Sequence, residues 1–193
     1  MKFILTLFVA TFLCSPAIWA APKSESMVGQ VAPQLSGQQA QGNGLLKMRQ
    51  LMAEFGFKKD AQGKLIEVDG KYVPEVTRNV LVLNFFSTSC VPCIREIPTY
   101  NRIAQSFEGK NAKLIYVNVD TEISDADMTR FIAKKKIDLP MLMPNQRDAI
   151  RKYKVYSLPR IVVIDKEGKI AMELHGFHDD LEKVLTDQIN QLL

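Results

Sequence analysis

The chain has 193 residues, of which 47% are hydrophobic and 24% charged, with ten glycines, nine prolines and three cysteines. This length and composition suit one well-packed globular domain and exclude a disordered chain, a collagen-like repeat and a small disulfide-rich fold. With 25 Lys and Arg against 21 Asp and Glu, the formal net charge is only +4 and is spread along the chain. Such a charge does not build a nucleic-acid-binding surface, so we expect no nucleic-acid partner.

The first twenty residues have the pattern of a cleavable secretory signal peptide. Met1 and Lys2 precede an apolar run over residues 3–13, and Ala20 offers a small residue at a plausible cleavage point. An uncleaved membrane anchor is the alternative, but eleven helical residues rise only about 16 Å, which is short of a bilayer core. We therefore expect removal of residues 1–20 and export to the periplasm.

Removal of this segment changes the cysteine count. Cys14 leaves with the signal peptide, so the mature chain keeps only Cys90 and Cys93. In an oxidising compartment such an even pair is expected to be able to form a disulfide.

Composition divides the rest of the chain into a leader and one domain. Residues 21–43 are rich in Gly, Gln, Ser and Pro, which predicts a flexible leader. The folded domain is expected over residues 44–193, with its core over about residues 64–193. At its start, apolar residues recur at helical spacing over residues 45–57, which predicts an amphipathic packing helix.

A hairpin is expected next. Asp69-Gly70 lies between two segments with strand character, residues 64–68 and 71–76, and this dipeptide is the strongest short hairpin signal. Pro74 cannot donate to a ladder of hydrogen bonds, so the second strand is expected at a sheet edge.

Strands and helices then alternate to the end of the chain. Residues 79–86 are too uniformly apolar to be half exposed, which predicts a central strand with both faces covered. Ser124 and Asp127 resemble a capping box that begins a helix. The remaining elements are expected as strands over residues 112–119, 139–143, 160–164 and 169–174, and as helices over residues 91–107 (with Pro98 inside), 124–136, 147–153 and 178–193. This alternation predicts an α/β fold with a central sheet.

The two remaining cysteines lie where the buried strand gives way to a helix, in the sequence Cys90-Val91-Pro92-Cys93. The free N–H groups and the dipole at a helix N-terminus stabilise a thiolate at Cys90. Cys93 lies three residues further on, on the same helix face, where its sulfur can close a bond with the first. Pro92 suits the first turn of a helix because it has no N–H to leave unpaired. The pattern predicts a redox-active dithiol in which Cys90 exchanges with a partner and Cys93 resolves the mixed disulfide.

Two other interpretations of these cysteines are weaker. An inert disulfide between Cys90 and Cys93 would close too short a loop to be placed there for stability alone. A zinc site could recruit His175 and His178, which are also three residues apart, but the separation from Cys93 is far longer than in compact zinc modules. We therefore expect no metal.

The segments VLVLNFFSTSCVPCIREIP and SLPRIVVIDKEGKI together resemble the TlpA/ResA group of exported thioredoxin-fold proteins, over about Val80 to the C-terminus. The resemblance implies a thioredoxin-like fold, with a central mixed sheet flanked by helices and here an N-terminal helical and hairpin extension. It also implies thiol–disulfide exchange with partners in the cell envelope, including apocytochrome c for some members.

The same resemblance assigns Pro159 as a cis-proline facing the dithiol, and X-Pro bonds are the ones in which the cis form costs little. Leu158 would present its backbone to a substrate peptide, which could pair beside the proline. With the residues between the cysteines, Val91 and Pro92, these positions are the expected substrate-binding surface.

Glu96 corresponds to a glutamate that the family carries near the active-site helix. One turn beyond Cys93, a carboxylate could relay protons or raise the pKa of a thiol, although an exposed solubilising Glu is the alternative. Asn84 occupies the strand position where cytosolic thioredoxins carry a buried acid and cannot titrate. Ser89 and Arg160 depart from the family pattern, and both are expected to alter the lip around the dithiol.

The sequence thus predicts an exported thiol–disulfide oxidoreductase without a cofactor, monomeric, and acting as a reductant with a possible membrane electron donor. The alternatives are a peroxiredoxin-like thiol peroxidase, for which Ser87 would supply a hydroxyl three residues before Cys90, and a metal-binding chaperone. The extension over residues 45–57 could dock a partner.

Overall fold

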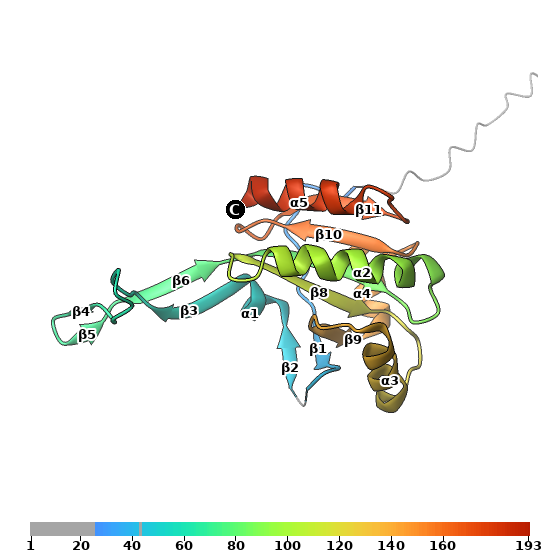
Figure 1. Cartoon of the computed structure of the whole chain (residues 1–193), viewed down its shortest axis with the longest axis horizontal. Coiled ribbons are helices and arrows are strands. Elements are labelled where there is room, and N and C mark those ends of the chain that lie inside the picture. Colours follow the sequence, from blue (N-terminus) through green and yellow to red (C-terminus); the bar gives the residue numbers. More distant parts are fainter. Residues whose placement is uncertain (1–25, 43) are drawn as a thin grey trace, which may run out of the picture.

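A computed structural model describes residues 26–42 and 44–193 (Figure 1). Its centre is a seven-stranded mixed sheet in the order β11-β10-β7-β8-β9-β1-β2. Strands β7, β8 and β9 are parallel, whereas β10 is antiparallel to both β7 and β11. The strands are β1 (Ser36–Gln39), β2 (Leu45–Lys47), β7 (Val80–Phe86), β8 (Ala112–Asn118), β9 (Met141–Pro144), β10 (Arg160–Ile164) and β11 (Ile170–His175).

Helices cover both faces of this sheet, as the uniformly apolar central strand predicted. Every residue of β7 is buried. Val82 and Phe86 pack in one core with residues of α2, α3 and α5, while Leu83 and Phe85 pack in a second core with α1, α4 and the N-terminal segment. The helices are α1 (Met48–Met52), α2 (Val91–Ser106), α3 (Asp125–Lys135), α4 (Gln146–Tyr153) and α5 (Leu181–Leu192). The thioredoxin-like fold is therefore confirmed.

Local signals placed the ends of several elements correctly. Ser124 caps α3 by accepting the N–H of Asp127 at 3.1 Å, as the capping box predicted. Pro98 lies inside α2. The turn at Asp69-Gly70 joins β4 (Glu67–Val68) to β5 (Lys71–Tyr72), and both turn residues have positive φ, as a two-residue hairpin loop requires.

The predicted flexible leader is wrong for residues 26–42. Strand β1 pairs with both β2 and β9 inside the central sheet, and Met27 and Leu35 are buried. Gly37 makes this pairing possible, since a Cβ there would lie 2.1 Å from the carbonyl oxygen of Met143. The polar, glycine-containing composition suggested flexibility. Composition alone does not reveal that such a segment can pair with a strand that is distant in the sequence.

The predicted helix over residues 45–57 is also wrong over most of its length. Only Met48–Met52 are helical, and the flanking residues form β2 and β3 (Ala53–Phe57). Strand β3 pairs with β6 (Pro74–Arg78) rather than packing on the core, so Phe55 is 82% exposed. The apolar residues happen to recur at helical spacing, but strand pairing on both sides of α1 determines the structure of this segment.

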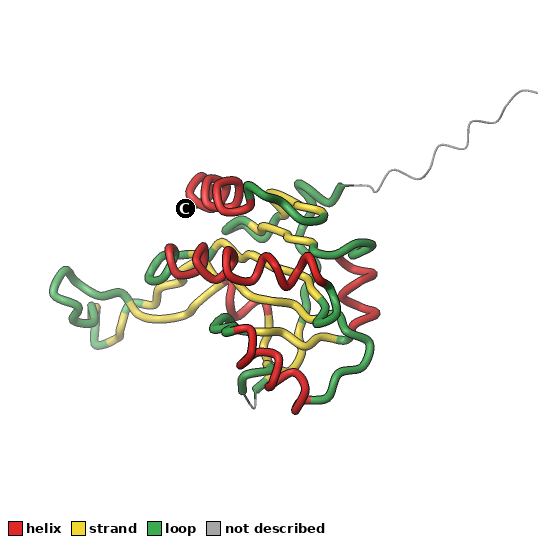
Figure 2. Tube along the Cα trace, turned by 45° about the vertical axis from the view of Figure 1, so that its right-hand side comes forward, coloured by secondary structure: helices red, strands yellow, loops and turns green. Residues whose placement is uncertain are grey.

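Residues 53–78 form an arm that projects from the body of the molecule (Figures 1 and 2). It contains β3 and β6, paired with each other, and carries the β4–β5 hairpin at its tip. Pro74 begins an edge strand, as expected, but this strand pairs with β3 and not with residues 64–68.

The predicted signal peptide, residues 1–20, and Cys14 lie outside the described residues. Within residues 26–42 and 44–193, none of the helices is both long and apolar enough to span a bilayer.

Candidate functional site

The two cysteines are joined where β7 passes into α2. Cys90 is the N-cap of α2, and its Sγ is bonded to that of Cys93 at 2.06 Å. The N–H of Cys93 donates to Cys90 Sγ at 3.3 Å. Cys90 is partly exposed, whereas Cys93 is only 3% exposed. An incoming thiolate therefore reaches Cys90 first, and Cys93 is sheltered behind it.

The position of Cys90 favours its thiolate once the disulfide is opened. The first N–H groups of a helix have no intrahelical partner, and the helix dipole is positive at this end. Val91 and Pro92 fill the first turn between the cysteines, and Val91 is 66% exposed beside the disulfide. The site thus combines an accessible sulfur, a helix N-terminus that would stabilise its thiolate, and an apolar contact surface.

Asp120 fixes the loop that leads into Cys90, a role the sequence reasoning missed. Its carboxylate, just beyond the end of β8, accepts the hydroxyls of Ser87 and Thr88 and the N–H of Thr88. Asn118 donates to the same carboxylate at 2.8 Å. Burial by itself would raise the pKa of Asp120, but these hydrogen bonds outweigh it and the pKa is lowered. The available signal was an acidic residue following a buried strand that neighbours β7.

The side chain of Ser87 is part of this scaffold. Its hydroxyl donates to Asp120 and lies 2.9 Å from the hydroxyl of Ser89. The hydroxyl considered for a peroxidase pattern therefore has other partners here.

The Leu158–Pro159 peptide bond is cis, as the resemblance implied. The carbonyl of Pro159 accepts the N–H of Gly176 at 2.8 Å, which ties this corner to the end of β11. A groove begins at Leu158 and runs along the loop before Cys90. Its lining includes Ser87, Ser89, Asp120, Tyr156 and Leu158.

Glu96 is buried, so it is not a solubilising surface residue. It is 2% exposed, and its Oε1 accepts the N–H of His178 at 3.3 Å. Among the described residues nothing hydrogen-bonds to its Oε2 or to Oδ1 of the buried Asn84. Loss of water raises the pKa of Glu96 to about 7, and the bond from His178 opposes that rise only in part. A carboxyl with this pKa can hold or release a proton near neutral pH.

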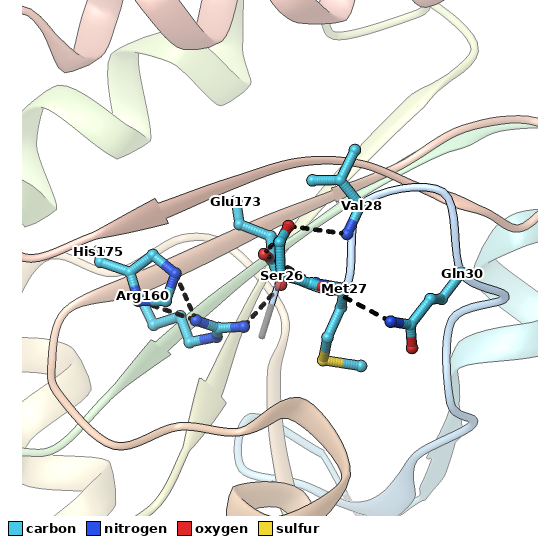
Figure 3. A network of polar contacts seen from close by, with 7 residues as sticks. All are labelled: Ser26, Met27, Val28, Gln30, Arg160, Glu173 and His175. Atoms are coloured by element: carbon cyan, nitrogen blue, oxygen red, sulfur yellow. Dashed lines mark hydrogen bonds and ion pairs between the residues drawn. The ribbon is translucent and has the colours of Figure 1, made fainter. Parts of the chain in front are cut away.

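Arg160 does not reach the lip of the dithiol, contrary to expectation. It is 1% exposed, and its side chain points toward Glu173 and His175 (Figure 3). Its Nη2 lies 2.7 Å from Oε1 of Glu173, and its Nη1 lies 2.7 Å from Nε2 of His175. Burial, and then the Arg160 guanidinium, lower the pKa of His175, which favours the neutral imidazole that can accept this contact.

The other oxygen of Glu173 holds the N-terminal segment. Its Oε2 accepts the hydroxyl of Ser26 at 3.0 Å and the N–H of Met27 at 3.1 Å (Figure 3). The residue after the cis-proline is thereby linked, through Arg160 and Glu173, to the first residues that the structure describes.

The two histidines considered for a metal site have separate contacts. His175 lies against Arg160, and the backbone of His178 binds Glu96. Over residues 26–42 and 44–193, no three His, Cys, Asp or Glu side chains gather as a metal site would require.

The sheet order, the disulfide at the start of α2 and the cis peptide bond before Pro159 define a thioredoxin-fold protein with a C-x-P-C site. The chain belongs to the AhpC/TSA family, whose sequence model matches residues 28–172.

Its relatives include proteins named thiol-disulfide oxidoreductase ResA. The protein from Bacillus thuringiensis subsp. konkukian is 28% identical over 117 residues, which cover 61% of this chain and 64% of the relative. That from Bacillus subtilis is 26% identical over 118 residues, or 61% of this chain and 62% of the relative. The match therefore spans less than two thirds of the length of these relatives.

Solved structures show the same fold. The thioredoxin domain of a thiol-disulfide oxidoreductase from Bacteroides vulgatus has a TM-score of 0.63 at 19% identity, covering 86% of this chain and 100% of that one. A thiol:disulfide interchange protein of the thioredoxin family from Chlorobium tepidum has a TM-score of 0.61 at 17% identity, covering 84% of this chain and 94% of that one.

Proposed function

We propose that this protein is an exported thiol–disulfide oxidoreductase that exchanges the Cys90–Cys93 pair with proteins of the cell envelope. The observation that carries the proposal is a disulfide at a helix N-terminus with one accessible and one sheltered sulfur. The names of the ResA relatives support it.

In the reducing direction, the Cys90 thiolate attacks one sulfur of a client disulfide. A bond forms between Cys90 and that sulfur, and the other client sulfur leaves as a thiolate. The Cys93 thiolate then attacks Cys90 Sγ, which closes the internal disulfide and releases the second client thiolate. Two electrons pass to the client, and a dithiol protein acting as donor must return them by the reverse exchange.

Glu96 supplies a proton site for this cycle. Cys93 must lose its proton before it can attack, and Glu96 lies one turn further along the same helix face. Because its pKa is raised to about 7, the carboxyl is partly deprotonated near neutral pH and can accept that proton, directly or through water. Asn84 cannot serve, because an amide does not titrate.

The setting of the reaction follows from the N-terminal sequence and the family resemblance. We expect the predicted signal peptide, residues 1–20, to direct the mature chain to the periplasm, where a membrane protein could act as electron donor. Envelope proteins that need reduced cysteines, apocytochrome c among them, are the proposed clients, and Leu158, Pro159, Val91 and Pro92 the proposed contact residues.

A trapping experiment tests the proposal. In Cys93→Ala the mixed disulfide cannot be resolved, so client proteins should remain attached to Cys90 and be identifiable by mass spectrometry of envelope extracts. The matched control, Cys90→Ala, keeps one cysteine but should capture nothing, because its sulfur is buried. If Cys93→Ala captures no protein, or if the wild type consumes peroxide far faster than it exchanges with protein disulfides, the proposal is wrong.

A further inference from the structure

The arm, residues 53–78, leaves the body at the end of β7 opposite the dithiol. Arg78 lies two residues before β7 and Cys90 four residues after it, and a seven-residue strand spans about 23 Å. The base of the arm is closed, because the N–H of Asn79 donates to the carbonyl of Met52 at 2.9 Å. The arm is therefore a self-contained excursion from the fold, remote from Cys90.

One face of the arm is apolar and faces solvent. In the register of β3 and β6, Phe55 lies opposite Val76 and Phe57 lies opposite Pro74, so these side chains share a face. Phe55 is 82% exposed, Phe57 50% and Val76 48%. Near the tip, the ring of Tyr72 contacts that of Phe57 at 5.8 Å between centroids, which extends the apolar surface.

The other face of the same two strands is polar. It carries Glu54 and Gly56 on β3 with Thr77 and Glu75 opposite them on β6. This alternation is the pattern of a sheet that is covered on one side only. A two-stranded ribbon alone is marginally stable in water, and a second layer on its apolar face would stabilise it. Among the described residues, nothing provides that layer.

Charge argues against a lipid surface or a strongly charged protein as that layer. Residues 53–78 contain five Lys or Arg and five Asp or Glu, so the arm has no net charge. It has no long-range attraction to an anionic membrane or to an acidic or basic partner. A second copy of the arm meets no net repulsion and offers the same apolar face.

The charge distribution along the arm also favours one orientation of two copies. The strands at the base of the arm, residues 53–57 and 74–78, carry two Glu and one Arg, whereas residues 58–73 toward the tip carry four Lys and three Asp or Glu. In an antiparallel arrangement about a two-fold axis, the base of each arm, with a net charge of −1, approaches the tip of the other arm, with a net charge of +1. A parallel arrangement would instead bring ends of like net charge together, which is unfavourable.

We propose that the arm is a self-association element. Two copies pack the apolar faces of their arms antiparallel, as a small two-layer β-sandwich, and leave the two dithiols at the outer ends of the dimer. The side chains of Phe55, Phe57 and Tyr72, of about 150–250 Å² each, are at least half exposed. Leu65, Val68 and Val76 are exposed as well. Their combined exposed area approaches the lower limit of a specific interface, about 600 Å² per partner. The dimer is thus expected to be concentration-dependent. It replaces the monomer expected from the sequence, and it does not depend on the proposed function.

Sedimentation or light scattering of the mature chain over a wide range of concentration tests this. The Cys90→Ala/Cys93→Ala double variant serves as background, so that intermolecular disulfides cannot contribute. This protein should dimerise, Phe55→Ser/Val76→Ser should be monomeric at every concentration, and Glu75→Gln, on the polar face, should dimerise like the parent. A background protein that stays monomeric at all concentrations, or an apolar-face variant that still dimerises, would overturn the proposal.

Two further measurements keep the test decisive if Phe55→Ser/Val76→Ser folds poorly. Joining Met52 to Asn79 through a short glycine linker removes the arm where its ends already meet, and the product should be a folded monomer. A photo-reactive amino acid at position 76 should cross-link the two copies to each other through the arms. If that residue reacts only within its own chain, or if the wild type binds phosphatidylglycerol vesicles while remaining monomeric, the arm is not a dimerisation element.

Discussion

Two ion pairs of equal length lie at opposite ends of the central sheet, and their surroundings differ. At the dithiol end, Arg160 and Glu173 are 2.7 Å apart, with 1% and 5% of their side chains exposed. At the base of the arm, Lys113 and Glu54 are also 2.7 Å apart, but 39% and 50% exposed. Distance alone would equate the two pairs. Burial separates them, because a buried charge that loses its partner has no water to replace it.

The comparison extends to the whole of both ends. Around the dithiol, Glu96 and Arg160 are buried inside the protein, and Asp120 is half-buried beneath four hydrogen-bond donors. Around the arm, apolar groups are exposed to water instead, with Phe55 the most exposed of them. Buried polar side chains at one end and exposed apolar side chains at the other both depart from the usual distribution, in which apolar residues are buried and polar residues face water. Such departures mark functional surfaces more often than structural ones.

The largest difference between the ends should appear on removal of one charge from the buried pair. Arg160→Met leaves Glu173 buried without its cation, so we expect a loss of about 3–5 kcal/mol in the free energy of unfolding. Urea denaturation measures it. The double variant Arg160→Met/Glu173→Leu should recover part of this loss, since it leaves no unpaired charge. A loss below about 1 kcal/mol for Arg160→Met would show that water reaches this ion pair and that it does not differ from the exposed Lys113–Glu54 pair.

Glu96 should make the dithiol end sensitive to pH near neutrality. Its pKa is raised from 4.5 to about 7 in the folded protein, so the folded state holds this proton more tightly than the unfolded chain does. The resulting stabilisation is fully present below pH 4.5 and is lost as pH rises through 7, for a change of roughly 3 kcal/mol.

The control for this effect is Glu96→Gln, which has no proton to lose. The difference in unfolding free energy between the wild type and this variant should change between pH 5 and pH 8. Comparing the two proteins cancels the opposite contribution of His175, whose pKa is lowered. Parallel pH profiles for the two proteins would mean that Glu96 titrates normally and cannot serve Cys93 as a proton acceptor near neutral pH.

The dithiol end was also the part that the sequence described best. The buried strand β7, the start of α2 and the cap at Ser124 are all determined by neighbouring residues, so local patterns were enough to place them. Cys90 and Cys93 were found for the same reason, since their chemistry depends on a spacing of three residues within one turn.

What the sequence did not show depends on contacts between distant segments. β1 joins the sheet through β9, about a hundred residues away, and β3 becomes a strand because β6 pairs with it. Arg160 was expected at the lip around the dithiol, because an arginine considered alone is usually exposed. Its burial becomes understandable only with its partner Glu173 on the neighbouring strand. Opposite charges on the two strands of the hairpin around Gly168 were the available signal for that pair.

The smallest effect is expected at the exposed pair, and it completes the comparison. Glu54→Gln removes the charge that faces Lys113, but water can solvate that lysine, so we expect a loss of at most about 1 kcal/mol in the free energy of unfolding. The glutamine oxygen can still accept the Nδ2–H of Asn79, which Glu54 accepts at 3.1 Å, so the base of the arm should stay closed. Added salt should reduce the difference between Glu54→Gln and the wild type, whereas it should leave the loss in Arg160→Met nearly unchanged. A loss of several kcal/mol for Glu54→Gln, insensitive to salt, would mean that the base of the arm is dry and that the arm belongs to the folded core.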